Sequence, residues 1–467
     1  MTLTSQSPSV RAKRTLRFAA ASCACATLGL LSHVAQAQML KGDDALTFKG
    51  IQLYGIVDIG LQYDSHAAPI SDYYPAGSSD IVQKNSNHSI VGATPSNLSQ
   101  SRVGLQGSEP IAADWSGVFK LETFFNPQSG EISDGPKSQV QNNGRPLASQ
   151  TTNLDSSVAG QIFQQSFAGI SSKTFGTLTF GRQNTLMADG ISKYDPQAAA
   201  QAFSVIGLSG TAAGAGDTQD RRLDSSAKYL IAAAPFHVGL QYKFSNAYGG
   251  ANTAFEAQAG GEFAGLSVDA YYIKVNSAIA VSALSAAQVA TLPSLGYSSS
   301  NSLAGTISDN TTFSLMARYA LSDFSLLGGY EHIKYADPNT PLPAGFDDIG
   351  GYKLAFVNNT AFPNDKILQV YWAGVKYTVA AALDLTVAYY GYRQNSYATG
   401  ANAGCSSTVS GSCSGNLNAV SFAAVYRLTK RFDAYAGAMW SGVQDGLANG
   451  YLNKNNIDPT LGVRFKF

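Results

Sequence analysis

The sequence predicts an all-β fold, a 16-stranded antiparallel transmembrane β-barrel with long loops at one end and short turns at the other. Three observations predict it: segments of about ten residues in which apolar and polar side chains alternate, connections that alternate between long and short, and a final strand that runs to the last residue. The composition agrees, because 13% of the residues are charged, about half the share in ordinary soluble domains, whereas 11% are aromatic.

The first 37 residues have the pattern of a cleaved export signal. Four basic residues precede an apolar run from Phe18 to Leu31, and Ala35 and Ala37 follow at the spacing of a cleavage site. We therefore expect residues 1–37 to be removed and residues 38–467 to form the barrel. Cleavage takes away four basic and no acidic residues, so the net formal charge falls from +0 to −4. A charge this close to neutral gives no indication of nucleic acid as a partner.

The alternation first appears in QLYGIVDIGLQY, where Leu53 and Val57 share one face and Asp58 and Gln62 share the other. Similar segments recur, and no stretch after the first forty residues approaches the roughly 20 unbroken apolar residues of a membrane helix. The predicted strands begin near residues 51, 101, 115, 163, 176, 222, 236, 254, 266, 312, 324, 367, 383, 417, 432 and 459.

Charged side chains lie on the polar faces of several of these strands. Arg102 in SRVGLQGSE, Lys120 and Glu122 in WSGVFKLETFF, and Arg222 in RLDSSAKYLI all oppose apolar residues of their own strand. Arg182 in GTLTFGRQ instead shares the phase of the apolar residues around it. A β-bulge, or a strand end beyond the bilayer, would explain this exception.

The connections give a second, independent signal. The long connections are residues 64–99, 130–160, 186–220, 276–310, 336–366, 396–416 and 444–458. Short turns stand between them, for example at residues 110–114, 173–176, 232–235 and 429–431. All long loops therefore fall at one end of the sheet, which is the asymmetry between the extracellular and periplasmic ends of outer-membrane barrels.

The last strand, PTLGVRFKF, alternates apolar and polar residues up to Phe467. A bilayer offers no water to the free edge of a sheet, so this strand must pair with the first one and close the barrel. A barrel of about 16 strands is too wide for its side chains to fill, and we expect an aqueous channel inside.

The order and spacing of several segments resemble the general porins of Gram-negative outer membranes, particularly the beta-proteobacterial type. These segments are LYGIVDIGLQY, SRVGLQGSE, SFAGISSKTFGTLTFGRQ and the terminal GVRFKF. The resemblance covers essentially the whole chain after the signal. It implies an outer-membrane homotrimer that passes small hydrophilic solutes and ions by diffusion, with no cofactor.

The resemblance further implies that the third long loop, residues 186–220, folds inward and narrows the pore. In the family, acidic residues on this loop face basic residues on the opposite wall. By position, Asp195 takes the acidic side, with Asp189 close to it. The candidate constriction residues are then Arg102, Arg222, Asp195, Asp189, Glu122, Lys120 and Arg182. Gln164 stands where a third wall arginine is common, and together with the net charge of −4 it leads us to expect a weak cation preference.

Each candidate also has a purely structural interpretation. For Arg102 and Arg222 the less favoured alternative is a salt bridge between wall strands, and for Asp195 it is the cap of a turn beside Pro196. Aromatic residues near strand ends, such as Tyr54, Tyr242, Trp372, Phe432 and Trp440, are expected in the interfacial girdles.

Cys405 and Cys413 lie eight residues apart in a long loop of an exported chain, which favours a disulfide. A metal site is the alternative, but no histidine lies near them in the sequence.

Two other classes of function are kept as alternatives. The first is a substrate-specific channel of similar architecture, and the second is a barrel enzyme or adhesin that works through its long loops. The sequence has no G-x-S-x-G, H-E-x-x-H or phosphate-binding glycine motif, so we do not expect an enzyme, a metal or a cofactor.

Overall fold

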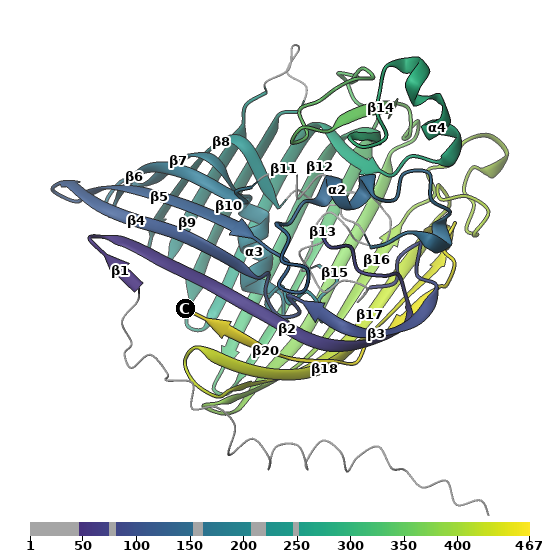
Figure 1. The fold of residues 1–467 in the computed structure, drawn as a ribbon. Coiled ribbons are helices and arrows are strands. Elements are labelled where there is room, and N and C mark those ends of the chain that lie inside the picture. The colour runs from purple at the N-terminus through teal and green to yellow at the C-terminus, as the bar shows by residue number, and fades with distance from the viewer. Residues whose placement is uncertain (1–45, 74–80, 153–161, 207–220, 246–251) are drawn as a thin grey trace, which may run out of the picture. The chain divides into compact units, whose positions relative to one another are not determined.

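The computed structural model describes residues 46–73, 81–152, 162–206, 221–245 and 252–467. The predicted signal, residues 1–37, and residues 207–220 of the predicted constriction loop lie outside them. Within the described ranges, twenty strands form one sheet, and sixteen of these strands build the wall of a closed antiparallel barrel (Figure 1). No helix in this part of the chain is long and apolar enough to cross a membrane.

The sixteen wall strands follow one another in sequence order and pair with their neighbours. They are β2 (Ile51–Ala67), β4 (Arg102–Ala112), β5 (Trp115–Phe124), β6 (Gln165–Ser172), β7 (Gly176–Asn184), β8 (Arg222–Ala233), β9 (Phe236–Lys243), β10 (Ala254–Phe263), β11 (Leu266–Ser282), β12 (Ser302–Leu321), β13 (Phe324–Ala336), β15 (Lys366–Ala380), β16 (Leu383–Gln394), β17 (Gly415–Arg427), β18 (Phe432–Asp445) and β20 (Thr460–Lys466). The other strands are β1 (Leu46–Phe48), β3 (His88–Pro95), β14 (Lys353–Asn358) and β19 (Asn455–Ile457).

The first and last wall strands close the barrel, as predicted. β20 pairs antiparallel with β2 from Ile56↔Lys466 to Gln62↔Thr460. The last residue takes part, because the Gly55 amide donates to the Phe467 carbonyl at 2.9 Å and the Phe467 amide donates to the Gly55 carbonyl at 3.0 Å. Phe467 therefore takes part in the seam between the first and last wall strands.

The predicted strand starts agree with the structure except at β12, which begins at Ser302 rather than near residue 312. Beyond a register shift between Val275 and Ala278, β11 and β12 continue to pair as far as Ser282↔Ala304. The prediction was wrong here because this ribbon extends past the ten or so residues that cross a bilayer, and residues outside lipid need no strict apolar alternation.

The outer face carries aromatic rings at two heights. Near the short turns, ring pairs include Phe324 with Tyr377, with centroids 4.4 Å apart, and Phe236 with Phe263, 5.6 Å apart. Nearer the long loops, other pairs follow, such as Tyr242–Phe244, Tyr272–Phe313 and Tyr371–Tyr389. This is the double girdle of a membrane barrel.

Two of the aromatic residues expected in the girdles point into the barrel instead. The Tyr54 hydroxyl donates to Glu122 at 2.8 Å, and the Trp372 indole donates to the carbonyl of Tyr194 at 3.2 Å. The expectation was wrong because both residues have the phase of the inward-facing positions of their strands, and position along a strand decides the side chain's face.

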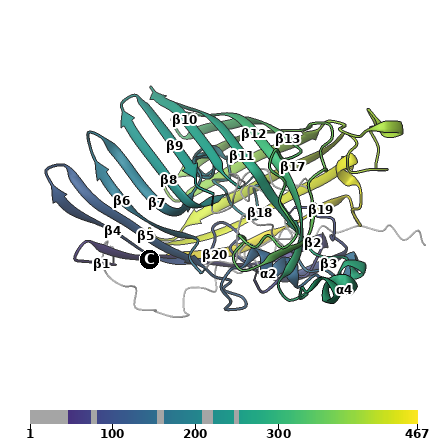
Figure 2. The same cartoon turned by 90° about the horizontal axis from the view of Figure 1, so that it is seen from above.

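The long loops form a compact layer at one end of the barrel, where α2 (Gly135–Val140), α4 (Ala286–Thr291) and β14 gather (Figures 1 and 2). β14 runs parallel to the outer part of β12, and Leu303, Ile307 and Leu354 are fully buried between these segments. Single 3-10 turns lie at Leu147–Ser149, Leu292–Leu295, Gly400–Asn402 and Gly446–Ala448. In the connection between β16 and β17, a disulfide joins Cys405 and Cys413, with 4.9 Å between their Cα atoms.

Candidate functional site

A nine-residue helix, α3 (Leu186–Tyr194), lies inside the barrel (Figure 1). It begins after Thr185, whose side-chain oxygen accepts the Ala188 amide at 3.0 Å, which is a standard N-cap. The Leu186 amide donates to Glu256 on the wall strand β10 at 2.8 Å. The start of the third long loop is thus held by its own cap and by the barrel wall.

The helix packs on an inner wall that is apolar rather than wet. Its residues Met187 and Ile191 belong to the same buried cluster as Ile333 of β13, Val370 of β15 and Tyr390 of β16. Burial of such side chains contributes about 1.5–3 kcal/mol each, so this wall is a hydrophobic seat for the loop. The sequence could have predicted this covered wall, because the inward-facing positions of the late strands are apolar. Side chains that line a water-filled lumen are expected to be polar.

The rest of the described loop follows the wall around the lumen. Gln197 donates to Ser421 of β17 at 3.0 Å, and the Ala202 amide donates to the Asn97 carbonyl at 2.8 Å. The Phe203 ring meets Tyr435 of β18 edge to face, with 6.5 Å between centroids. Residues 186–206 thus cover the inner side of β8 to β18, and this part of the loop leaves uncovered the wall formed by β2 and β4 to β7.

Asp195 has a different place from the predicted one. Its carboxylate is 1% exposed and accepts the Tyr390 hydroxyl at 2.6 Å and the Ala199 amide at 2.8 Å. Burial raises the pKa of Asp195, and the hydrogen bond from Tyr390 opposes that rise. The structure therefore corrects its assignment to the pore face: Asp195 ties the loop to the wall, in keeping with the turn-capping alternative.

The uncovered wall carries a cluster of inward-facing charges, as the strand phase predicts. Glu122 of β5 is 1% exposed and lies 3.8 Å from Arg102 Nε and 3.5 Å from Lys120 Nζ. It also accepts the Tyr54 hydroxyl and the Gln165 amide, each at 2.8 Å. The side chains of Arg102 and Lys120 are 31% and 23% exposed, so their positive charges face the lumen. The buried Glu122 carboxylate holds both side chains in place.

Arg222 and Arg182 extend the cluster onto β8 and β7. The Arg222 guanidinium stacks over Phe124 at 4.6 Å from the ring centroid, among the charges of Arg102, Arg182 and Glu122. Arg182 is paired with Asp224. The predicted bulge is present, because the pairing of β7 with β8 shifts register between Gly181 and Gln183.

Asp189 is the acidic residue that the loop turns toward this wall. It lies in the first turn of α3 with a side chain that is 50% exposed, and Lys228 of β8 lies 2.6 Å from it. Asn184 donates to its second oxygen at 3.1 Å. Lys228 lies in the predicted strand RLDSSAKYLI but is not among the candidates from the sequence, although its side chain points into the barrel like those of Lys120 and Arg102.

The described wall and loop therefore combine the cations of Arg102, Lys120, Arg222 and Lys228 with the carboxylates of Glu122 and Asp189. Arg221, directly before β8, adds another cation, and burial lowers its pKa to about 10, which leaves it charged at neutral pH. Among these described residues the cations outnumber the carboxylates; Glu122 is buried and Asp189 is paired with Lys228.

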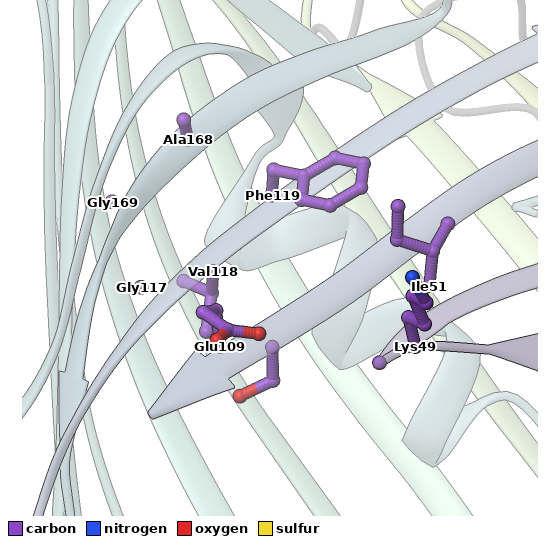
Figure 3. A pocket seen from close by; sticks show the side chains of 10 residues that line it. Lys49, Ile51, Glu109, Gly117, Val118, Phe119, Ala168 and Gly169 are labelled. Carbon is purple, nitrogen blue, oxygen red and sulfur yellow. The ribbon is translucent and has the colours of Figure 1, made fainter. Parts of the chain in front are cut away.

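A separate cavity of about 330 Å³ lies near the short turns, lined by Lys49, Ile51, Glu109, Phe119 and Ala168 among others (Figure 3). Ile51 and Ala168 are exposed on the outer face of the barrel. None of the residues lining this hollow belongs to the charged cluster, so it is a feature of the outer wall and not of the lumen.

Comparison with known proteins agrees with this architecture. A family model described as Gram-negative porin matches residues 19–446. An outer membrane porin protein of Bordetella pertussis is 26% identical over 197 residues, which are 42% of this chain and 43% of that protein, so less than half of that relative's length is matched.

Two solved structures share the fold. The anion-selective porin from Comamonas acidovorans has a TM-score of 0.58 at 16% identity, with 89% of this chain and 99% of that chain covered. OmpT of Vibrio cholerae, in its trimer form, has a TM-score of 0.53 at 16% identity, with the same shares covered. Since the family model spans most of the sequence and the barrel carries the girdles of a membrane protein, the chain is an outer-membrane protein of the Gram-negative porin family.

Proposed function

We propose that the barrel is a channel for passive diffusion of small hydrophilic solutes and ions across the outer membrane, and that it prefers anions. The observation that carries the preference is the pair Arg102 and Lys120, whose side chains are 31% and 23% exposed on the wall that the described loop leaves uncovered. Opposed charges across a constriction favour polar solutes, and an excess of one sign favours the opposite ion. One structural neighbour, from Comamonas acidovorans, is anion-selective by name, which fits the proposal.

This proposal replaces the weak cation preference expected from the net charge of −4. A net charge includes residues far from the lumen, and at physiological salt a charge is screened over about 8 Å. Selectivity therefore depends on the few charges beside the narrowest part. Each of these, at about 6 Å from the ion path in water, is worth roughly 0.7 kcal/mol, a factor of about three in preference.

The test is the reversal potential of the purified protein in planar bilayers with a salt gradient. We expect the sign that corresponds to anion preference, and a shift toward cations by about threefold for each charge lost in Arg102→Gln and Lys120→Gln. Lys173→Gln, which removes an exposed charge from a short turn, is the matched control and is expected to leave the potential unchanged. If the unaltered protein prefers cations, the proposed anion preference is wrong. If it gives no conductance steps, the proposal that it is a channel is wrong.

We also infer a homotrimer whose subunits meet along the outer face of β4 to β6. β5 and β6 are only 10 and 8 residues long, and their outer face is hollowed beside the small residues Gly117 and Ala168 (Figure 3). We expect a second copy to pack against this surface. The neighbour from Vibrio cholerae is a trimer by name. Ala168→Arg is expected to give monomers in analytical ultracentrifugation, and a monomeric unaltered protein would contradict the trimer.

A further inference from the structure

Near the short turns, the inner wall repeats the arrangement found around Glu122, in which one carboxylate holds two cations. In the first repeat, the Asp384 unit, the carboxylate of Asp384 lies 2.6 Å from Arg427 Nη1 and 3.3 Å from Lys376 Nζ. The Asp384 side chain is 10% exposed, whereas those of Arg427 and Lys376 are 35% and 40% exposed. The unit therefore has one positive charge in excess, and its cations are the accessible groups.

A second repeat, the Asp433 unit, lies beside the first on β18 and β20. The carboxylate of Asp433 lies 2.6 Å from Arg464 Nη2 and 3.0 Å from Lys466 Nζ. Asp433 is 1% exposed, and the Lys466 side chain is 37% exposed. Arg427 pairs directly with Asp433, and Asp433 with Arg464, so the two units form one continuous row across β15 to β20.

The row faces the lumen on the short-turn side of the third long loop. A Cβ on Gly374, two residues before Lys376, would stand 2.5 Å from Pro196 of the loop. Asp433 lies two residues before Tyr435, whose ring meets the loop edge to face. Residues two apart on a strand point to the same side, so Lys376 and Asp433 point into the barrel. A solute that passes the loop from the long-loop end therefore meets the row next.

The row is separate from the charged cluster of the constriction. Counted from the short turns, Asp384 and Asp433 are the second residues of β16 and β18, whereas Glu122 is the eighth residue of β5. Six residues of a tilted strand correspond to roughly 15 Å along the barrel axis. Charges are screened over about 8 Å at physiological salt, so the cluster and the row act on a passing ion one after the other.

Two further charges border the row. Asp58 of β2 pairs with Arg464, but it is 0% exposed and accepts the Tyr435 hydroxyl at 2.6 Å. At the other end, Arg318 of β12 is exposed and has the inward phase of the fully buried Met316. Among these described residues, the cations therefore outnumber the carboxylates, and the cations are the more exposed.

We propose that this row is a second anion site, which receives small oxyanions with two or more negative charges, such as tricarboxylates, on the periplasmic side of the constriction. The inference rests on the anion channel proposed above. Asp384 and Asp433 lie two strands apart, and strands are about 4.8 Å apart, so the two units are centred roughly 10 Å from each other. A solute with several carboxylates reaches both units, whereas one with a single carboxylate reaches only one. Arginine binds carboxylates through two parallel hydrogen bonds, and the exposed lysines add charge at the edge of each unit.

The experiment titrates citrate at neutral pH against the purified protein in detergent and measures the dissociation constant by saturation-transfer NMR. The double variant Lys376→Gln, Lys466→Gln removes the more exposed cation of each unit and leaves each aspartate its arginine. At about threefold for each charge lost, this variant is expected to bind citrate about tenfold more weakly. Lys173→Gln, at a short turn outside the row, is the control and is expected to bind like the unaltered protein.

Asp384→Asn tests the same site in the opposite direction, so that partial loss of folding cannot imitate the result. It releases Lys376 and Arg427 from their carboxylate and is expected to tighten citrate binding about threefold. Citrate binding that stays unchanged in the double variant, or that weakens in Asp384→Asn, would overturn the proposal. Loss of citrate binding only in Arg102→Gln with Lys120→Gln would overturn it as well, because citrate would then bind at the constriction alone.

The titration needs no current, so the second anion site and the channel function can fail separately. A protein that gives no conductance steps would contradict the channel, and the citrate titration would still decide the site. A protein that conducts and prefers anions, but whose citrate affinity is the same in the double variant, would contradict only the second site.

Discussion

The hydrogen bond from Tyr390 to Asp195 allows a direct test of how the third long loop is attached to the barrel wall. Both groups are buried, the oxygens are 2.6 Å apart, and no solvent competes for the carboxylate. Tyr390→Phe removes the hydroxyl and leaves the ring in its place on the hydrophobic seat. The substitution therefore perturbs one interaction and no packing.

The magnitude follows from the burial of the acceptor. Leaving a buried group without one of its hydrogen-bond partners costs about 1–3 kcal/mol, although Asp195 keeps the Ala199 amide as a donor at 2.8 Å. At about 1.4 kcal/mol for each tenfold change, the ratio of docked to undocked loop falls by roughly 5- to 150-fold. The loop is predicted to narrow the lumen, so its release is expected to enlarge the channel for part of the time.

The assay is single-channel recording in planar bilayers, with open-channel noise and conductance as readouts. Tyr390→Phe is expected to show added high-conductance excursions. Tyr389→Phe is the matched control, since the neighbouring hydroxyl donates to Asn418 at 2.7 Å on the outer face and does not touch the loop. Identical traces from Tyr390→Phe and the unaltered protein would refute the view that Asp195 anchors the constriction.

Three further predictions concern other contacts of the loops. A Cβ on Gly374 would stand 2.5 Å from Pro196 and 2.5 Å from the Val387 carbonyl, so Gly374→Ala should push the loop off the wall and reproduce the noise of Tyr390→Phe in the same recordings. Asp189→Asn leaves the Lys228 cation without its partner at 2.6 Å, and the reversal potential should move toward anions by about threefold; a shift toward cations would contradict it. Replacing both Cys405 and Cys413 by Ser opens an outer loop, so limited proteolysis there should speed up while the conductance is unchanged.

The barrel itself could be predicted because lipid imposes strict rules on it. Alternation along each strand, loop asymmetry and the need for a closed edge fix strand number and seam, and these agree with the structure down to the pairing of Phe467 with Gly55. Prediction failed where lipid no longer acts, as in the outer part of β12, which is paired with β11 in water.

In the candidate site, the wall residues could be predicted from the sequence and the loop residues could not. The alternation along each strand was enough to predict that Arg102 and Glu122 point into the lumen, because a side chain on a wall strand points either inward or outward. A loop residue such as Asp195 has no such constraint, and its burial depends on Tyr390, 195 positions away in the sequence. The apolar inner wall was visible in the sequence, but its meaning requires knowing which loop covers it.

The seam between the two ends of the barrel has a consequence for biogenesis. The Gly55 amide donates to the Phe467 carbonyl and the Phe467 amide donates to the Gly55 carbonyl, so the barrel cannot close until both of these distant residues have reached the membrane. Until then the chain has free strand edges and an exposed apolar face. Contacts between residues so far apart in the sequence form slowly. We therefore expect the polypeptide to stay unfolded from its export until β2 and β20 pair in the membrane.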